Sequence, residues 1–344
     1  MAQQNADEID RRFPKVLRRV GGYNLNEFTP DRDTINLSKM MVGSEGTLGI
    51  VLDAKVNLVP LPKAKAVMVI GFADLLEALA ATPVILTHKP SAVEIMDKAI
   101  LDNTRQNANL DSIRNTFVTG DPAATLCVEM YDDTKEALPP RLEALEADLR
   151  GRKTGTFYFK ETDPAKQQRV WQLREAALGL SMAVKEDAKS ISFVEDTAVN
   201  PEKLSEFIGR FLQIIHGHGT TAGIYAHASV GCLHVRPVVN MKTAEGVAKF
   251  EAIANDVADL VLEYGGSLSG EHGDGLVRSP FMQKMFGEQL YDAFREIKRT
   301  FDPENLLNPG KITDAPPVTS NLRFGANYKT PNPFTFFDYS DYGG

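Results

Sequence analysis

Apolar and polar residues alternate between residues 48 and 58, which is the period of a strand with one buried face. The apolar side of this alternation consists of Ile50, Leu52, Ala54, Val56 and Leu58. Pro60 and Pro62 follow, and proline interrupts a ladder of backbone hydrogen bonds because it has no N–H. The pattern therefore predicts a strand over residues 48–58 and a boundary near residue 62.

Short runs rich in β-forming residues alternate with helical segments between about residue 66 and residue 235. The runs cover residues 67–71, 125–131, 156–159, 191–194, 223–227 and 233–238. A chain that mixes short strands and helices in this way favours an α+β fold, in which helices cover a sheet.

Capping residues indicate where several helices begin or end. Asn200 before Pro201, and Ser279 before Pro280, each predict a helix N-terminus. Residues 243–264 have an apolar helical face and end at two glycines, so we expect a helix that packs on the sheet. The polar residues 1–45 contain a helical pattern over residues 9–20. We expect this segment to pack against another part of the structure.

Composition and charge exclude several classes of protein. The chain has 344 residues, of which 43% are hydrophobic and 24% are charged, as in an ordinary globular protein. Its net charge is −8 and it has no dense basic run, which argues against a nucleic-acid partner. No apolar stretch is long enough for a membrane span. Cys127 and Cys232 form no CxxC pair, so we expect a reducing, cytoplasmic location.

Two glycine-containing motifs hold the residues with the most evident chemistry. HASVGCLH contains His227 and His234, and SGEHGDG contains Glu271 and His272. Imidazole and carboxylate groups are ligands for Zn²⁺ or Mn²⁺. We expect the two histidines to lie on neighbouring strands, at the opening of one site. On an extended segment Glu271 and His272 would point to opposite sides, leaving one as ligand and the other as acid or base. Alternatively, His227 and His234 are two unrelated histidines, and GEHGDG is merely a tight, polar turn.

Two further segments have weaker signals. MVGSEGTLGIV, with Gly43, Gly46 and Gly49, could present backbone N–H groups to a phosphate, although it precedes an expected strand and so is not a dinucleotide fingerprint or a Walker loop. A plain strand-entry loop is the alternative. DPENLLNPGK, over residues 302–311, predicts a helix end followed by a sharp turn.

Taken in order, MVGSEGTLGIV, WQLREAA, HASVGCLHVRP, GGSLSGEHGDG and FDPENLLNPGKI closely resemble the C-terminal half of the FAD-linked oxidase family. That family includes D-lactate dehydrogenases, glycolate oxidase subunits and D-2-hydroxyglutarate dehydrogenases. The resemblance implies an α+β fold with antiparallel, ferredoxin-like sheets flanked by helices. It divides the chain into a remnant of the FAD-binding domain (1–62), a substrate and metal domain (63–312) and an irregular linker (313–344). The linker would lead to a missing downstream module, since the chain looks most like large bacterial members fused to an iron–sulfur module.

The resemblance also implies roles for individual residues. His227, His234 and Glu271 match ligands of a divalent metal, Zn or Mn, and His272 matches the base that removes the substrate hydroxyl proton. Arg174 matches an arginine that binds the carboxylate of a 2-hydroxy acid. The segments that touch FAD match Gly43, Ser44, Glu45, Gly46, Thr47, Gly49 and Asn308. The α-hydrogen would leave as hydride to the flavin, giving a 2-keto acid.

Two departures from the family pattern change these expectations. No glycine-rich pyrophosphate loop is present in residues 1–45, so we expect most of the flavin site to come from other residues. Arg236 stands where many relatives have Asn, and an unpaired cation there would favour a dicarboxylate such as D-2-hydroxyglutarate. Alternatively, Arg236 neutralises a nearby acid or contacts the flavin.

Two rival functions also fit the motifs. The chain could be a non-catalytic metal-binding fragment or assembly subunit that lacks its flavin partner. It could also be a metal-dependent hydrolase, since two histidines, a glutamate and an adjacent histidine suit water activation.

Overall fold

An antiparallel sheet of eight strands forms the centre of the computed structural model, which describes residues 1–30, 34–182, 186–329, 331 and 333–340. Its strand order is β4-β1-β3-β2-β7-β8-β5, and β6 pairs with β8. The strands are β1 (Ala64–Phe72), β2 (Ala92–Asp97), β3 (Ala124–Asp132), β4 (Phe157–Glu161), β5 (Lys189–Ser190), β6 (Thr197–Ala198), β7 (Ala222–His227) and β8 (Cys232–Val239). The expected α+β fold with an antiparallel sheet is thus confirmed.

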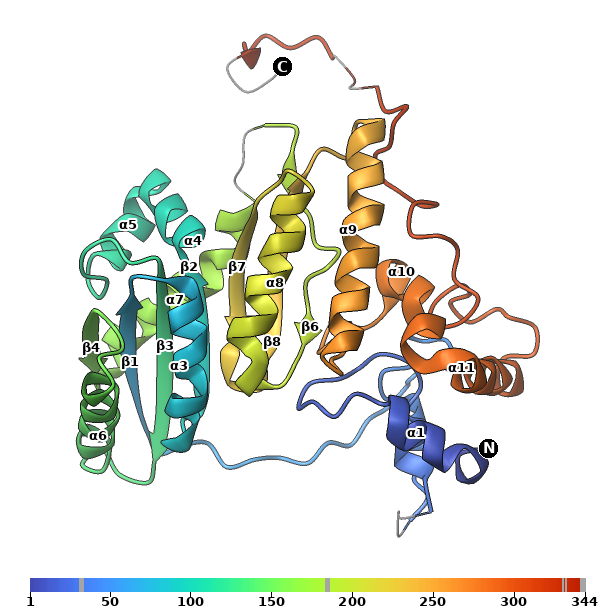
Figure 1. Ribbon diagram of the computed structural model, residues 1–344, viewed down its shortest axis with the longest axis horizontal. Coiled ribbons are helices and arrows are strands. Elements are labelled where there is room, and N and C mark those ends of the chain that lie inside the picture. The colour runs from blue at the N-terminus through green and yellow to red at the C-terminus, as the bar shows by residue number, and fades with distance from the viewer. Residues whose placement is uncertain (31–33, 183–185, 330, 332, 341–344) are drawn as a thin grey trace.

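Helices cover both faces of this sheet. The longer helices are α3 (Leu75–Thr87), α6 (Leu138–Gly151), α7 (Pro164–Ser181), α8 (Leu204–Gly217), α9 (Ala244–Glu263) and α11 (Met282–Phe301). The shorter ones are α1 (Ala6–Arg12), α2 (Ser38–Met41), α4 (Lys98–Asn103), α5 (Ala108–Arg114) and α10 (Gly275–Arg278). Figure 1 shows α3 and α8 side by side over one face. The opposite face packs against α7, whose Val170 and Leu173 share a core cluster with Val67 and Tyr225.

Five of the six β-rich runs of the sequence correspond to strands, and the strands β2, β5 and β6 lie outside these runs. Residues 191–194 form no strand and lie between the two short strands β5 and β6. Strand β2 was not predicted, because its sequence AVEIMD places two acidic residues in a short apolar run and shows no alternation. The sheet therefore contains one central strand that the sequence pattern did not reveal.

The strand predicted over residues 48–58 is absent, and that prediction was wrong. Residues 50–62 lie in no helix or strand and cross to β1 as the light-blue trace at the bottom of Figure 1. Leu52 and Leu58 are 94% and 90% exposed. Alternation produces a strand where a neighbouring strand supplies hydrogen bonds and a core covers the apolar side, and the described residues supply neither here.

The N-terminal segment packs against α11 (Figure 1). The ring centroids of Phe13 and Phe286 are 5.0 Å apart, and those of Tyr23 and Phe294 are 5.6 Å apart. Helix α1 ends at Arg12, well before residue 20, because Pro14 disfavours helical geometry in the residue before it. This packing brings the residues that follow α1 to the loop before α10, where the Val20 N–H binds the Ser269 carbonyl.

The predicted caps are partly confirmed. The Asn200 side chain accepts a hydrogen bond from the Glu202 N–H, and the Thr243 side chain caps α9. A 3₁₀ turn begins at Ser279 and leads directly into α11, so the predicted helix start is confirmed, although the Ser279 side chain does not cap it. Its hydroxyl donates to the Gly275 carbonyl and accepts from the Ile312 N–H instead, which ties α10 to the turn after α11.

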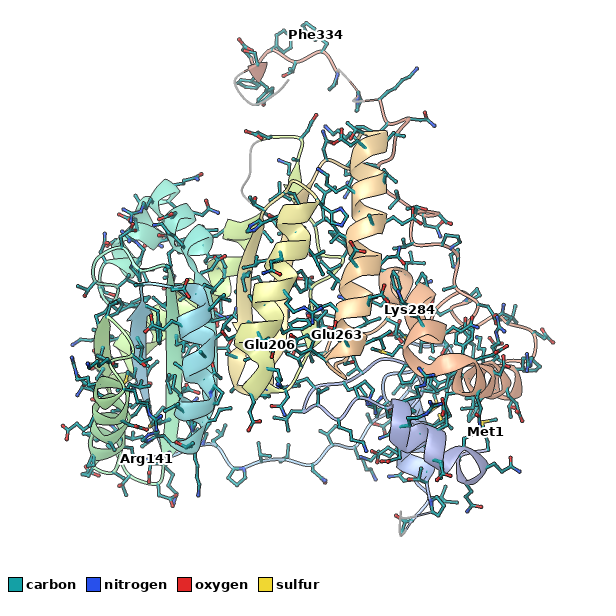
Figure 2. The ribbon with its side chains drawn as sticks, viewed as in Figure 1. Met1, Arg141, Glu206, Glu263, Lys284 and Phe334 are labelled. Carbon is teal, nitrogen blue, oxygen red and sulfur yellow. The ribbon has the colours of Figure 1, made fainter. Side chains whose placement is uncertain are left out.

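The chain beyond α11 forms no further helix or strand among the described residues. Phe334, labelled in Figure 2, stands away from the body of the protein and is 86% exposed. None of the helices in the described part of the chain combines the length and the apolar character that crossing a membrane requires.

Candidate metal and substrate site

Strand register brings the motif histidines together on one face of the sheet. Glu94 of β2 lies directly opposite His227 of β7, and Tyr225 lies opposite His234 of β8. Paired residues of antiparallel strands share a face, as do residues two apart along a strand. The face that packs against α7 therefore carries Glu94, Met96, Tyr225, His227, His234 and Arg236. The expectation that the two histidines lie on neighbouring strands is confirmed.

A tight turn between β7 and β8 fixes this arrangement. Residues Ala228–Val230 form a single 3₁₀ turn, and Gly231 follows in the left-handed region with φ 70°. A Cβ atom on Gly231 would lie 1.8 Å from the Val199 carbonyl oxygen. Glycine is therefore required there by both backbone conformation and space.

Asp196 holds the loop that carries Glu271 and His272. Its carboxylate is fully buried and accepts hydrogen bonds from the backbone N–H groups of Glu271, at 3.0 Å, and His272, at 2.9 Å. The Ser269 hydroxyl donates to the same carboxylate. The loop consequently bends instead of extending, so the opposite orientation expected for an extended segment does not arise: Glu271 Oε1 and His272 Nε2 are 3.9 Å apart. The role of Asp196 was not predicted from the sequence.

Three side chains present converging donor atoms. Glu271 Oε1 lies 3.2 Å from His227 Nε2 and 3.5 Å from His234 Nε2. All three donor atoms lie within 4.8 Å of one another. Two imidazole nitrogens and one carboxylate oxygen are a donor set typical of catalytic Zn²⁺ and Mn²⁺ sites. Two other groups of possible ligands include Asp196, but its oxygens already accept backbone hydrogen bonds, so His227, His234 and Glu271 fit a cation best.

The two histidines have different electrostatic surroundings. His234 is 3% exposed, and its burial, together with the nearby His227 and His272, lowers its pKa to about 2. Its ring lies between Tyr225, at 4.9 Å, and His272, at 5.2 Å and nearly parallel. The hydrogen bond with Glu94 is the main reason why the pKa of His227 is raised. His234 is therefore a neutral imidazole with a lone pair available to a cation.

Arg174 reaches the site from α7. Its Nη2 and Nε atoms lie 2.8 and 3.1 Å from Glu94 Oε2, and its guanidinium carbon lies 4.8 Å from the centre of the Tyr225 ring. Neither Glu94 nor its strand β2 was predicted from the sequence. The available signal was the carboxylate itself, because a carboxylate in an apolar strand needs a charged or hydrogen-bonding partner.

Arg236 has a partner of its own. Its Nη2 atom lies 2.6 Å from Glu195 Oε2, and the two side chains are each 5% exposed. The expected preference for a dicarboxylate depended on an Arg236 that a monocarboxylate would leave unpaired, and this premise was wrong. The ion pair corresponds instead to the alternative in which Arg236 neutralises a nearby acid.

The segments expected to touch FAD meet around Glu45. The Glu45 carboxylate accepts hydrogen bonds from the N–H groups of Asp274, at 2.5 Å, and Gly275, at 2.9 Å. Asn308 Nδ2 donates to the Glu45 carbonyl at 2.7 Å. The glycine loop (residues 43–49), the GEHGDG loop (residues 270–275) and the turn after α11 are thus in direct contact.

Other residues of the glycine loop are held internally. Ser44 and Thr47 are buried, and the Thr47 hydroxyl lies 2.6 Å from the Tyr23 hydroxyl. Gly43 and Gly46 adopt left-handed backbone conformations, with φ 76° and 69°, whereas Gly49 does not. Contact of these residues with flavin stays a prediction.

Comparisons with known proteins identify the family of this chain. The sequence profile of the family described as "FAD linked oxidases, C-terminal domain" matches residues 61–312. The chain is similar to D-2-hydroxyglutarate dehydrogenase of Pseudomonas putida, with 33% identity over 90% of this chain and 31% of that protein. It is also similar to glycolate oxidase subunit GlcD of Bacillus subtilis, with 26% identity over 89% of this chain and 60% of that protein. The chain thus spans less than two thirds of either relative.

A solved structure shares the fold. Substrate-bound p-cresol methylhydroxylase matches 74% of this chain and 54% of its own, with a TM-score of 0.55 and 17% identity. The profile covers most of the sheet and its helices, including the residues that form the candidate site. The chain therefore belongs to the FAD-linked oxidase family and contains that family's C-terminal domain.

Proposed function

We propose that this chain forms the substrate and metal site of an FAD-dependent dehydrogenase that oxidises a 2-hydroxy acid to a 2-keto acid. The observation that carries the proposal is the convergence of His227, His234 and Glu271, with the His272 ring stacked against His234. The names of the relatives support this substrate class, since they are D-2-hydroxyglutarate and D-lactate dehydrogenases and a glycolate oxidase subunit.

His227 Nε2, His234 Nε2 and Glu271 Oε1 would hold a divalent cation, either Zn²⁺ or Mn²⁺. When bound, such a cation supplies Lewis acidity at the substrate hydroxyl, and FAD supplies a hydride acceptor. The glycine loop and Asn308 are the candidates in this chain for contact with FAD.

His272 is the candidate base for the hydroxyl proton. Its side chain is 40% exposed, so a proton that it accepts can pass on to solvent. Histidine suits this task because its ordinary pKa is near neutrality. The loop held by Asp196 keeps the His272 ring beside His234, at the edge of the candidate cation site.

Arg174 is the candidate for binding the substrate carboxylate. Nε and Nη2 bind Glu94, and Nη1 takes no part in that contact. Guanidinium groups pair with carboxylates through parallel N–H donors, so the N–H groups turned away from Glu94 suit the 1-carboxylate of a hydroxy acid.

Because most of the flavin site is expected to come from other residues, the test uses this chain together with the residues that complete that site, loaded with FAD. It measures steady-state oxidation of D-2-hydroxyglutarate, D-lactate and glycolate with a dye as electron acceptor. Loss of general-base catalysis in His272→Asn should lower kcat by about 10²- to 10⁴-fold. His218→Asn is a matched control, because His218 pairs with Asp256 at 2.7 Å, away from the site. Unchanged turnover in His272→Asn, or no oxidation of any of the three acids by the wild type, would refute the proposal.

A further inference from the structure

Glu94 lies at the centre of the candidate site, although no sequence motif marks it. It is the third residue of β2, is 8% exposed, and lies opposite His227 in the strand register. Its oxygens bind different neighbours: Oε1 is 2.9 Å from His227 Nδ1, and Oε2 is 2.8 Å from Arg174 Nη2. One buried carboxylate thus contacts both a candidate metal ligand and the candidate carboxylate-binding arginine.

The contact with His227 determines which imidazole nitrogen is free. A neutral imidazole carries one N–H, and a carboxylate beside Nδ1 favours the proton on that nitrogen because it accepts the hydrogen bond. Nε2 then presents its lone pair, and this atom lies 3.2 Å from Glu271 Oε1 within the candidate metal site. Glu94 therefore selects the tautomer that a cation needs.

The contact with Arg174 allows Glu94 to do this while buried. A buried carboxylate without a counter-charge is costly, so Glu94 needs a cationic partner at this position. Arg174 supplies the counter-charge through two N–H groups, both directed at Oε2. Oε1 consequently remains available to His227, and the guanidinium plane is fixed in return.

We propose that Glu94 is a positioning residue that orients His227 and Arg174 together, linking the cation site to the carboxylate-binding site. The inference rests on the proposed metal site. An amide has one acceptor oxygen and one donor group, so Glu94→Gln can satisfy only one of these two neighbours. Arg174→Met removes the second contact alone and leaves Oε1 beside His227.

Zn²⁺ titration against a chromophoric chelator, with circular dichroism to verify folding, tests this role. Removing a partner of a ligating histidine typically weakens metal binding by about 10- to 100-fold, and we expect this loss in Glu94→Gln. Arg174→Met should lower Zn²⁺ affinity less than Glu94→Gln does. Glu129→Gln is the matched control, because Glu129 is also 8% exposed, lies on the adjacent strand β3, and contacts Ser91 instead of the site.

The outcomes separate this inference from the proposed function. Equal Zn²⁺ affinity in wild type and Glu94→Gln would refute the role of Glu94 and leave the metal site standing. A wild type that binds no Zn²⁺ would refute both. If Glu94→Gln does not fold, long-range ¹H–¹⁵N correlation on the Zn²⁺-loaded wild type decides: a protonated Nδ1 on His227 supports the inference, and Zn²⁺ bound through Nδ1 overturns it.

Discussion

Asp274 is a buried carboxylate whose ionisation should make the stability of the protein depend on pH. It is 0% exposed; its Oδ2 accepts the Gly22 N–H at 2.8 Å, and its Oδ1 is a buried oxygen without a hydrogen-bond partner among the described residues. Burial raises the pKa of Asp274 from 3.8 to about 7, and the nearby charge of Glu45 adds to this effect. The Gly22 hydrogen bond, Arg278 and Arg19 oppose it.

The sign and size of the effect follow from this raised pKa. The folded protein binds the Asp274 proton more tightly than the unfolded chain does, so stability is lost as pH rises from about 4 to about 7. Each pKa unit corresponds to about 1.4 kcal/mol, so the total loss for this one group is roughly 4 kcal/mol. Asp274→Asn keeps an oxygen for the Gly22 N–H and removes the charge. The variant should therefore gain roughly 4 kcal/mol relative to wild type between pH 4 and pH 8.

Urea unfolding of both proteins at several pH values measures this difference. The free energy of unfolding of Asp274→Asn, minus that of wild type, should rise with pH and level off above pH 7. Asp121→Asn is a control, because Lys98 lowers the pKa of the exposed Asp121 below its ordinary value of 3.8; its difference from wild type should therefore be constant between pH 4 and pH 8 and change only at lower pH. A difference between Asp274→Asn and wild type that is constant over this pH range would show that Asp274 ionises as freely in the folded protein as in the unfolded chain.

Two further predictions concern the backbone. Gly231→Ala places a Cβ atom 1.8 Å from the Val199 carbonyl oxygen at φ 70°, and should lower the free energy of unfolding in chemical denaturation by at least about 2 kcal/mol. Gly217→Ala is the control, because a Cβ there meets nothing within 4 Å and should leave stability nearly unchanged. Equal stability of the two variants would refute the steric argument. Trypsin should cut after Lys55, which lies in the exposed segment without strand pairing, before it cuts after Lys65 within β1. Mass spectrometry of early fragments measures this order. The reverse order would indicate that residues 50–62 are protected.

Much of the fold could be predicted because local patterns and tertiary structure agree. The runs around the two histidines are apolar and bounded by glycine, and they became β7 and β8 as expected. Residues 48–58 show the opposite case. Their alternation is as regular as that of a real strand, yet whether they join a sheet depends on a partner that local sequence does not specify.

The candidate site could be predicted only where its residues lie in motifs. His227, His234, Glu271 and His272 were found in this way, and the structure brings them together. Glu94 and Asp196 were missed because their contacts join residues distant in sequence: 133 positions separate Glu94 from His227, and 75 separate Asp196 from Glu271. Arg236 shows the same limit, since its partner Glu195 comes from a different part of the chain.

The metal content of the purified chain tests the central claim most directly. After dialysis against Zn²⁺ or Mn²⁺ and removal of free ions, elemental analysis of wild type should find about one equivalent, because three protein ligands converge there. His234→Ala should retain far less, since loss of one of three ligands weakens binding by orders of magnitude, whereas His88→Ala, whose histidine pairs with Asp148, should match wild type. Equal metal content in His234→Ala and wild type would contradict the assignment of His227, His234 and Glu271 as the metal site.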